Sequence, residues 1–131
     1  MTNAVAKRLA ACSAVVAAGL VLIPATAAKD GDVLVRGTCT GATTSKLKLS
    51  EEDGRIEVEF EVDQNRNGVR WSVVLRRPTT VLARGTRVTR GPSGSFEFRR
   101  VVGNRAGQDR IIARATRSSG EACRAAATFG S

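Results

Sequence analysis

The chain has 131 residues, of which 42% are hydrophobic and 25% are charged, and this length suits a single domain. It carries 21 Lys and Arg against 12 Asp and Glu, a formal charge of +9, and it contains no histidine and no tyrosine. Without histidine, this chain cannot assemble Ser-His-Asp or Cys-His catalysis, a histidine metal site or an imidazole pH switch.

The N-terminal residues 1–27 have the three parts of a secretory signal peptide. Lys7 and Arg8 supply positive charge, an apolar run follows over residues 9–23, and small residues around Ala27 form an A-x-A cleavage site. The apolar run is about fifteen residues long, fewer than the roughly twenty that a membrane-spanning helix needs. We therefore expect a signal helix that is cleaved after Ala27 or the next residue, and a secreted, extracellular domain over residues 28–131 without a transmembrane segment.

Cleavage changes the cysteine count from odd to even. It removes Cys12 and leaves Cys39 and Cys123, which predict a disulfide in an exported chain. A redox-active or metal-binding pair would normally show C-x-x-C spacing, which is absent. Closing this loop would stabilise the domain by about 4–5 kcal/mol in the chain-entropy model. The remaining 104 residues keep a charge of +7, because the leader takes two cations with it.

Alternation of apolar and polar residues is the dominant pattern after the leader, and it predicts an all-β fold. In residues 55–63 the even positions are apolar, while Glu57, Glu59 and Glu61 occupy the other face. In residues 69–76 the odd positions, including Trp71, are apolar. Shorter alternating runs lie at residues 33–36, 46–49, 81–89, 95–99, 109–116 and 122–129.

Turn sequences such as Asp53-Gly54 and Asn67-Gly68 separate these runs at nearly even spacing. Seven or eight short strands in about 100 residues predict an antiparallel sandwich. If residues 55–63 and 69–77 formed a flush hairpin, Trp71 would share a face with Glu61. Keeping both apolar faces in the core therefore needs a bulge, a shifted register or two different sheets. An immunoglobulin-like sandwich separates its B and C strands in this way, and it buries a tryptophan on strand C.

Several segments resemble small secreted immunoglobulin-like β-sandwich proteins of high-GC actinobacteria, over nearly the whole chain after the leader. They are Cys39-Thr40-Gly41, residues 53–63, 67–71, 94–96 and 106–109, and Gly120-Glu121-Ala122-Cys123. The resemblance implies an exported immunoglobulin-like fold and implies little about function. The expected bridge differs from that of antibody domains, because Cys39 lies near the first strand and Cys123 on the last. It would join the chain ends instead of crossing the core, where we expect Trp71, Phe60, Phe96 and Phe98.

The hexad of residues 63–68 matches the opening of a calcium-binding loop, D-x-N-x-N-G. Asp63, Asn65 and Asn67 would then be the metal ligands. The twelfth position, where a bidentate glutamate belongs, is Val74, and Arg66 adds repulsion. We therefore interpret the hexad as a polar turn, and we expect neither a metal nor another cofactor.

The row of Glu57, Glu59 and Glu61 places carboxylates about 6–7 Å apart, at successive same-face positions of one strand. Two carboxylates at such distances can act as acid and base in a glycosidase. A hydrolase, however, raises the pKa of its acid by burial, which an exposed row does not provide. We expect these carboxylates to pair with Arg or Lys across strands, and we expect no enzymatic activity.

Alternation along the strands predicts that a set of arginines points outward. In an immunoglobulin-like sandwich, the strands that carry them belong to one sheet. The set comprises Arg70, Arg76, Arg110, Arg114 and Arg124, and Arg84 is a further candidate. Because the glutamate row falls in the other sheet, we hypothesise one Arg-rich face and one more acidic face. Such a basic face attracts anionic polymers, for example wall teichoic chains, lipid headgroups or nucleic acid. The aromatic residues all fall on core-facing positions, which disfavours nucleic acid. The alternative is a solvated surface whose arginines reflect codon usage.

The sequence thus predicts a secreted, monomeric, non-catalytic binding or structural module, whose partner is an anionic cell-wall polymer or a secreted protein. A protease inhibitor is the first alternative, with Arg76-Arg77-Pro78 or Arg90-Gly91-Pro92 as the loop that trypsin-like enzymes would bind. The nearby prolines weaken this hypothesis. A carboxylate-based hydrolase is the less favoured alternative.

Overall fold

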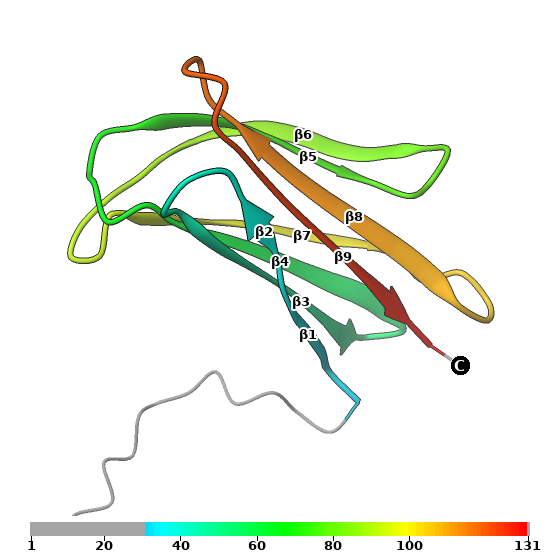
Figure 1. The fold of residues 1–131 in the computed structure, drawn as a ribbon. Coiled ribbons are helices and arrows are strands. Elements are labelled where there is room, and N and C mark those ends of the chain that lie inside the picture. Colours follow the sequence, from blue (N-terminus) through cyan, green and yellow to red (C-terminus); the bar gives the residue numbers. More distant parts are fainter. Residues whose placement is uncertain (1–30, 131) are drawn as a thin grey trace, which may run out of the picture.

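The computed structural model describes residues 31–130, which form an all-β fold of two antiparallel sheets packed face to face (Figure 1). The expected signal peptide and its helix lie outside the described residues. The strands in chain order are β1 (Val33–Arg36), β2 (Thr38–Cys39), β3 (Thr44–Glu52), β4 (Arg55–Asp63), β5 (Arg70–Arg76), β6 (Val81–Val88), β7 (Ser95–Gly103), β8 (Asp109–Thr116) and β9 (Ala122–Phe129).

The four-stranded sheet has the order β1-β3-β4-β7 and the five-stranded sheet the order β2-β9-β8-β5-β6. The predicted all-β sandwich and most strand positions are confirmed. The number of strands was underestimated, because the two-residue β2 is too short to show alternation. β3 and β7 are also longer than predicted, since polar residues continue the β3 ladder at both ends and residues 100–103, including the buried Val102, continue that of β7.

The separation of residues 55–63 and 69–77 into different sheets is confirmed. β4 lies between β3 and β7, whereas β5 pairs with β6 and β8. Both strands can therefore direct their apolar positions into the same core. Trp71 on β5 is fully buried, and its ring centroid lies 6.2 Å from that of Phe96. Its indole nitrogen donates a hydrogen bond to Gln64 Oε1 (3.2 Å), so its polar atom is satisfied.

The rest of the core follows from the same alternation. Phe60 and Phe98 have no exposed surface, and Phe96 and Phe129 are also buried, as strand parity predicted. The inner positions of the neighbouring strands add mainly leucine, isoleucine, valine and alanine. Alanine dominates on β8 and β9, where Ala113, Ala115 and Ala125 leave room for the aromatic rings of the facing sheet.

The first strands pass from one sheet to the other at Gly37. β1 pairs with β3, and β2 then pairs with β9 in the opposite sheet. A Cβ atom at Gly37 would lie 2.2 Å from Ser45 Oγ, so only glycine fits at this crossing. The predicted disulfide between Cys39 and Cys123 forms directly after it, between residues that pair across β2 and β9. The bridge therefore holds the first strands against the last one, as expected.

A buried ion pair closes one end of the sandwich. Arg77, just after β5, and Asp109, at the start of β8, are 7% and 2% exposed. The guanidinium binds the carboxylate through two hydrogen bonds of 2.8 Å, and it also donates to the Gly103 carbonyl. The backbone N–H of Arg105 donates to the same carboxylate (3.1 Å). These contacts join β5, β7 and β8 at a point where no apolar side chain does so.

We expect Asp109→Asn to destabilise the fold by about 3–5 kcal/mol, because it leaves the Arg77 charge buried without a counter-ion. The hydrogen bonds from Arg77 hold the pKa of Asp109 below its ordinary value of 3.8. The pair therefore stabilises the native state above that value, and this contribution is lost as the pH falls through the lower native pKa. Denaturant unfolding followed by Trp71 fluorescence between pH 2 and pH 7 measures both effects. Equal stability of the two proteins at pH 7 would contradict the assignment.

The open side between β6 and β7 is closed by an aromatic ring. Phe98 on β7 lies between two cations, with Arg87 Cζ 4.8 Å and Arg100 Cζ 4.2 Å from the ring centroid. β6 can approach this ring only because residue 85 is glycine. A Cβ atom there would lie 2.5 Å from Phe98 Cε2.

Gly85→Ala should therefore destabilise the protein by about 1–3 kcal/mol, since the added methyl group overlaps the Phe98 ring. Gly103→Ala is the matched control, because a Cβ atom at Gly103 meets nothing within 4 Å. Thermal unfolding of both variants provides the comparison. If the two substitutions lower the melting temperature equally, the close approach at Gly85 does not limit the packing of β6.

Candidate functional site

The outer face of the five-stranded sheet carries the candidate arginines, and we call it the arginine face. All six are exposed: Arg70 and Arg76 on β5, Arg84 on β6, Arg110 and Arg114 on β8, and Arg124 on β9. The only acidic residue of the five strands is Asp109, which points inward to Arg77. The arginine face thus presents six positive charges and no carboxylate.

The strand registers place four of these arginines close together. One row across the sheet runs Arg124–Arg114–Val74–Arg84, with Arg124 and Arg114 directly opposite each other. Arg76 lies in the next row, opposite Ile112. It is therefore diagonal to Arg114, a position for which Cα atoms in antiparallel strands are about 7–8 Å apart.

None of the six arginines has an ion-pair partner among residues 31–130. Arg76 donates hydrogen bonds only to nearby carbonyl oxygens, those of Arg77 (3.3 Å) and Pro78 (2.9 Å). For the other five, no hydrogen bond or ion pair of the side chain occurs within the described part of the chain. Their guanidinium groups are therefore free to bind a ligand.

The outer face of the four-stranded sheet differs, because it carries carboxylates and three of them form ion pairs with cations. Glu97 on β7 lies opposite Glu61. Lys46 lies 3.5 Å from Glu61, Lys48 lies 3.4 Å from Glu59, and Arg99 on β7 binds Glu57. Cross-strand pairing of the glutamate row is thus confirmed. This row is not freely exposed, however, because the side chains of Glu57, Glu59 and Glu61 are only 12%, 18% and 36% exposed. The stems of their cationic neighbours cover them.

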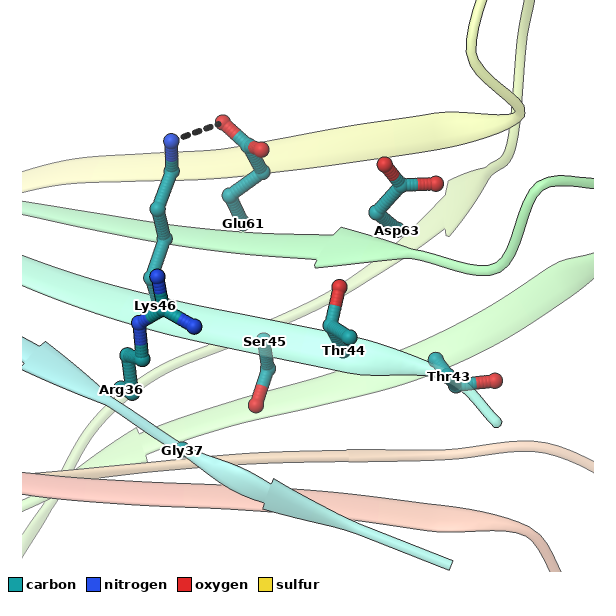
Figure 2. Close-up of a pocket in the computed structure, with 8 residues that line it drawn as sticks. All are labelled: Arg36, Gly37, Thr43, Thr44, Ser45, Lys46, Glu61 and Asp63. Atoms are coloured by element: carbon teal, nitrogen blue, oxygen red, sulfur yellow. Dashed lines mark ion pairs between the residues drawn. The ribbon is translucent and has the colours of Figure 1, made fainter. Parts of the chain in front are cut away.

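Shallow hollows in the surface lie away from the arginine face. One of about 320 Å³ lies beside the β1–β3 edge, and Figure 2 shows Thr44 and Asp63 on one side of it and the Lys46–Glu61 ion pair on the other. Its lining mixes cations, carboxylates and hydroxyl groups without a dominant charge. A second hollow, of about 430 Å³, lies between β6 and β7.

The calcium-like hexad is folded as a turn. The Asp63 carboxylate accepts a hydrogen bond from the backbone N–H of Asn65 (3.0 Å), and Asn65 has a positive φ of 57°. The side chain of Asn67 lies beside Gly91 of the next turn, since a Cβ atom built on Gly91 would be 3.2 Å from Nδ2 of Asn67. Within residues 31–130, no group of three or more His, Cys, Asp or Glu side chains is placed to hold a metal ion.

Of the three arginines in the segments considered for protease inhibition, Arg76 lies exposed on the arginine face, while Arg77 and Arg90 are held in place by the fold. Arg77 is buried in its ion pair with Asp109, so it cannot enter the specificity pocket of a protease. Arg90 is exposed, but its backbone N–H and carbonyl both bond to Ser95, and a cis peptide joins Gly91 to Pro92. This closed turn does not present an extended loop. No helix within residues 31–130 is long and apolar enough to cross a membrane.

Comparison with known proteins gives no relative from which a function could be transferred. No family model matches the chain, and the curated proteins contain no significant match to it.

Sequence reasoning found the arginines but missed how closely Arg114 and Arg124 approach each other. The sequence contained the information needed to find this, because the Ser119-Gly120 turn lies at the centre of the β8–β9 hairpin and so fixes its register. A flush hairpin about this turn pairs residues whose numbers sum to 238, and the observed register has this sum. It also missed Arg87 and Arg100, which alternation assigns to the interior and which pack on Phe98.

On the outer face of the four-stranded sheet, we expect the neighbouring carboxylates Glu57 and Glu59 to have different pKa values. The hydrogen bond from Arg99 lowers the pKa of Glu57, whereas burial and then the charge of Glu97 raise the pKa of Glu59. A side-chain ¹³C NMR titration should therefore find Glu59 above, and Glu57 below, the ordinary value of 4.5. In Arg99→Gln the midpoint of Glu57 should move upward. Coincident midpoints in the wild-type protein would contradict the pairing described here.

Proposed function

We propose that this protein is a secreted, non-catalytic binding module that holds an anionic cell-surface polymer on its arginine face. The observation that carries the proposal is the contrast between the two outer faces. The four-stranded face carries carboxylates, and cations pair with Glu57, Glu59 and Glu61, whereas the arginine face has six exposed guanidinium groups and no carboxylate. An unneutralised surface of one sign attracts polyanions and raises their rate of association.

The fold that we infer for this module is immunoglobulin-like. The orders β2-β9-β8-β5-β6 and β1-β3-β4-β7 correspond to A′-G-F-C-C′ and A-B-E-D. Three connections depart from that pattern. β3 and β4 form a hairpin within one sheet, where an immunoglobulin domain crosses from B to C. The chain then passes from the E position to C between β4 and β5, and from the D position to F between β7 and β8. β4 thereby takes the position of strand E, although its sequence suggested strand B.

Export is supported by two observations that agree with each other. The sequence of residues 1–27 predicts a signal peptide, and the Cys39–Cys123 disulfide is of the kind that persists in oxidising compartments. The non-catalytic character is supported by the pairing of Glu57, Glu59 and Glu61 with cations. A carboxylic acid in a hydrolase instead needs surroundings that keep it protonated.

The chemistry of the arginine face favours a charged chain over a nucleobase or an acyl chain. Trp71 and all four phenylalanines are buried, which leaves no aromatic surface on which bases could stack. Among residues 31–130, the exposed large apolar side chains are Leu34 and Val81. Only Val81 lies on the five-stranded sheet, at its β6 edge, so the arginine face offers little that could insert into a membrane.

We expect polyanion binding to fall steeply with salt and to depend on where the arginines lie, not on the net charge alone. The triple variant R70Q/R76Q/R110Q removes three charges from the arginine face. The matched control R36Q/R66Q/R105Q removes three exposed arginines elsewhere. Affinity for a heparin resin and for a cell-wall preparation should be measured between 50 mM and 500 mM NaCl.

The face variant should elute at lower salt than the wild type, with a slope of log K against log salt that is smaller by about one for each lost contact. The control should behave like the wild type. Equal losses in both variants would show that net charge alone causes retention. Binding that 500 mM salt does not weaken would contradict the proposal altogether.

A further inference from the structure

We propose that Arg114 and Arg124 together form the seat for a single phosphate group, so that the polymer on the arginine face is a phosphate ester and not a carboxylate polymer. This inference rests on the proposed function and names its ligand chemistry. It is carried by the direct opposition of two unpaired arginines within a surface that has no carboxylate.

The direct opposition of Arg114 and Arg124 is electrostatically unfavourable. Arg114 and Arg124 are Cα partners in adjacent antiparallel strands, which places their Cβ atoms about 4.5–5.5 Å apart. Like charges directly opposite each other destabilise a sheet. The neighbours in the same row are Thr38 and Val74, and within residues 31–130 neither arginine has an ion pair that would reduce the repulsion. An anion bound between the two guanidinium groups would.

The geometry of the bound anion distinguishes a phosphate from a carboxylate. A guanidinium is a planar fork of donors, and one such fork binds both oxygens of a carboxylate. Those oxygens keep outer lone pairs, but these lie in the carboxylate plane, so a second fork has to approach in that plane. A phosphodiester also has two free oxygens, but its tetrahedral phosphorus lets them accept from several directions, so two forks from neighbouring strands can share them. The exposed Thr38, paired with Arg124 on β2, places a hydroxyl donor beside this seat.

Arg76 is placed to bind the next charged group along the ligand. Arg76 is diagonal to both Arg114 and Arg110, at about 7–8 Å from each. Phosphates that recur along a chain at a similar distance can bind the seat and Arg76 at the same time. Val74 and Ile112 lie between these arginines and are half-buried, so the surface there is apolar. This pattern suits a linear phosphodiester polymer that lies across the strands.

The test exchanges the shape of the cations and keeps their charge. R114K/R124K retains two positive charges but loses both forks, while R70K/R110K makes the same exchange at two arginines of the same face that are not opposite each other. The probes are a soluble poly(glycerol phosphate), a polygalacturonate of equal charge and vesicles containing phosphatidylglycerol. Calorimetry gives the affinities at 50 mM salt, and Trp71 fluorescence verifies that each variant is folded.

The wild-type protein should prefer poly(glycerol phosphate) to polygalacturonate, and R114K/R124K should lose about tenfold of its affinity for the phosphate polymer, as expected when a bidentate arginine becomes lysine. R70K/R110K should lose clearly less affinity than R114K/R124K, because an exposed arginine without an opposed partner keeps its positive charge when it becomes lysine. Titration of ¹⁵N-labelled protein with inorganic phosphate should shift the Nε–H signals of Arg114 and Arg124 first.

Three outcomes would overturn the phosphate seat while the proposed function stands. They are equal affinity for both polymers, an unchanged R114K/R124K, and equal losses in the two lysine variants. Binding to phosphatidylglycerol vesicles without binding to the soluble polymer would show that the ligand is a lipid headgroup and not a phosphate polymer. Failure of the wild type to bind any polyanion at low salt would instead refute the proposed function itself.

Discussion

Every strand of this small sandwich has one side in the core, and this constraint decides where its charges can lie. The core takes nearly all of the inward positions, so a chain with a charge of +9 must place its cations on the two outer faces, at the strand edges and in the loops. Three of the seven glutamates lie on β4, between β3 and β7, and both neighbouring strands supply cations to them. Three more lie on β3 and β7, and the strands of the other sheet contain none. The asymmetry between the faces is therefore a property of the strand order as much as of the composition.

The same constraint explains which contacts had to be added where alternation ends. A sandwich of only 100 described residues buries limited apolar surface, and its edges and ends need other means of closure. The disulfide fastens the two-residue β2, which could not hold itself by ladder hydrogen bonds alone. The Arg77–Asp109 pair closes the end at which β5 and β8 meet, and Phe98 between two arginines closes the side between β6 and β7. A disulfide, a buried ion pair and cation–π contacts thus complete one core at its edges and at one end.

Much of this could be predicted from sequence, because period-2 alternation over eight or nine residues has few other solutions. It placed Trp71 and the phenylalanines in the core, put β4 and β5 in separate sheets, and pointed the six arginines outward. It could not find the Arg77–Asp109 pair, since residues 32 positions apart meet only once the strands are assembled. It likewise assigned 55–63 to strand B, because a strand's alternation says which face is buried and nothing about which neighbour it pairs with. Arg87 and Arg100 show a further limit: an inward position need not be apolar when an aromatic ring can accept its cation.

The arginine face also shows how a surface can be selected without a pocket. Solubility alone does not require six unpaired arginines on one sheet, since lysines or mixed charges would serve it equally well. The opposition of Arg114 and Arg124 adds a cost that a merely solvated surface has no reason to bear, because exchanging either residue for threonine or serine would relieve it without touching the core. Like charges are also opposed in the four-stranded sheet, Arg36 facing Lys46 and Glu61 facing Glu97, but that row contains both signs and Lys46 pairs with Glu61. The row of Arg114 and Arg124 contains no carboxylate. Such a surface is suited to neutralisation by something outside the chain, and the planar fork of arginine suits a phosphate.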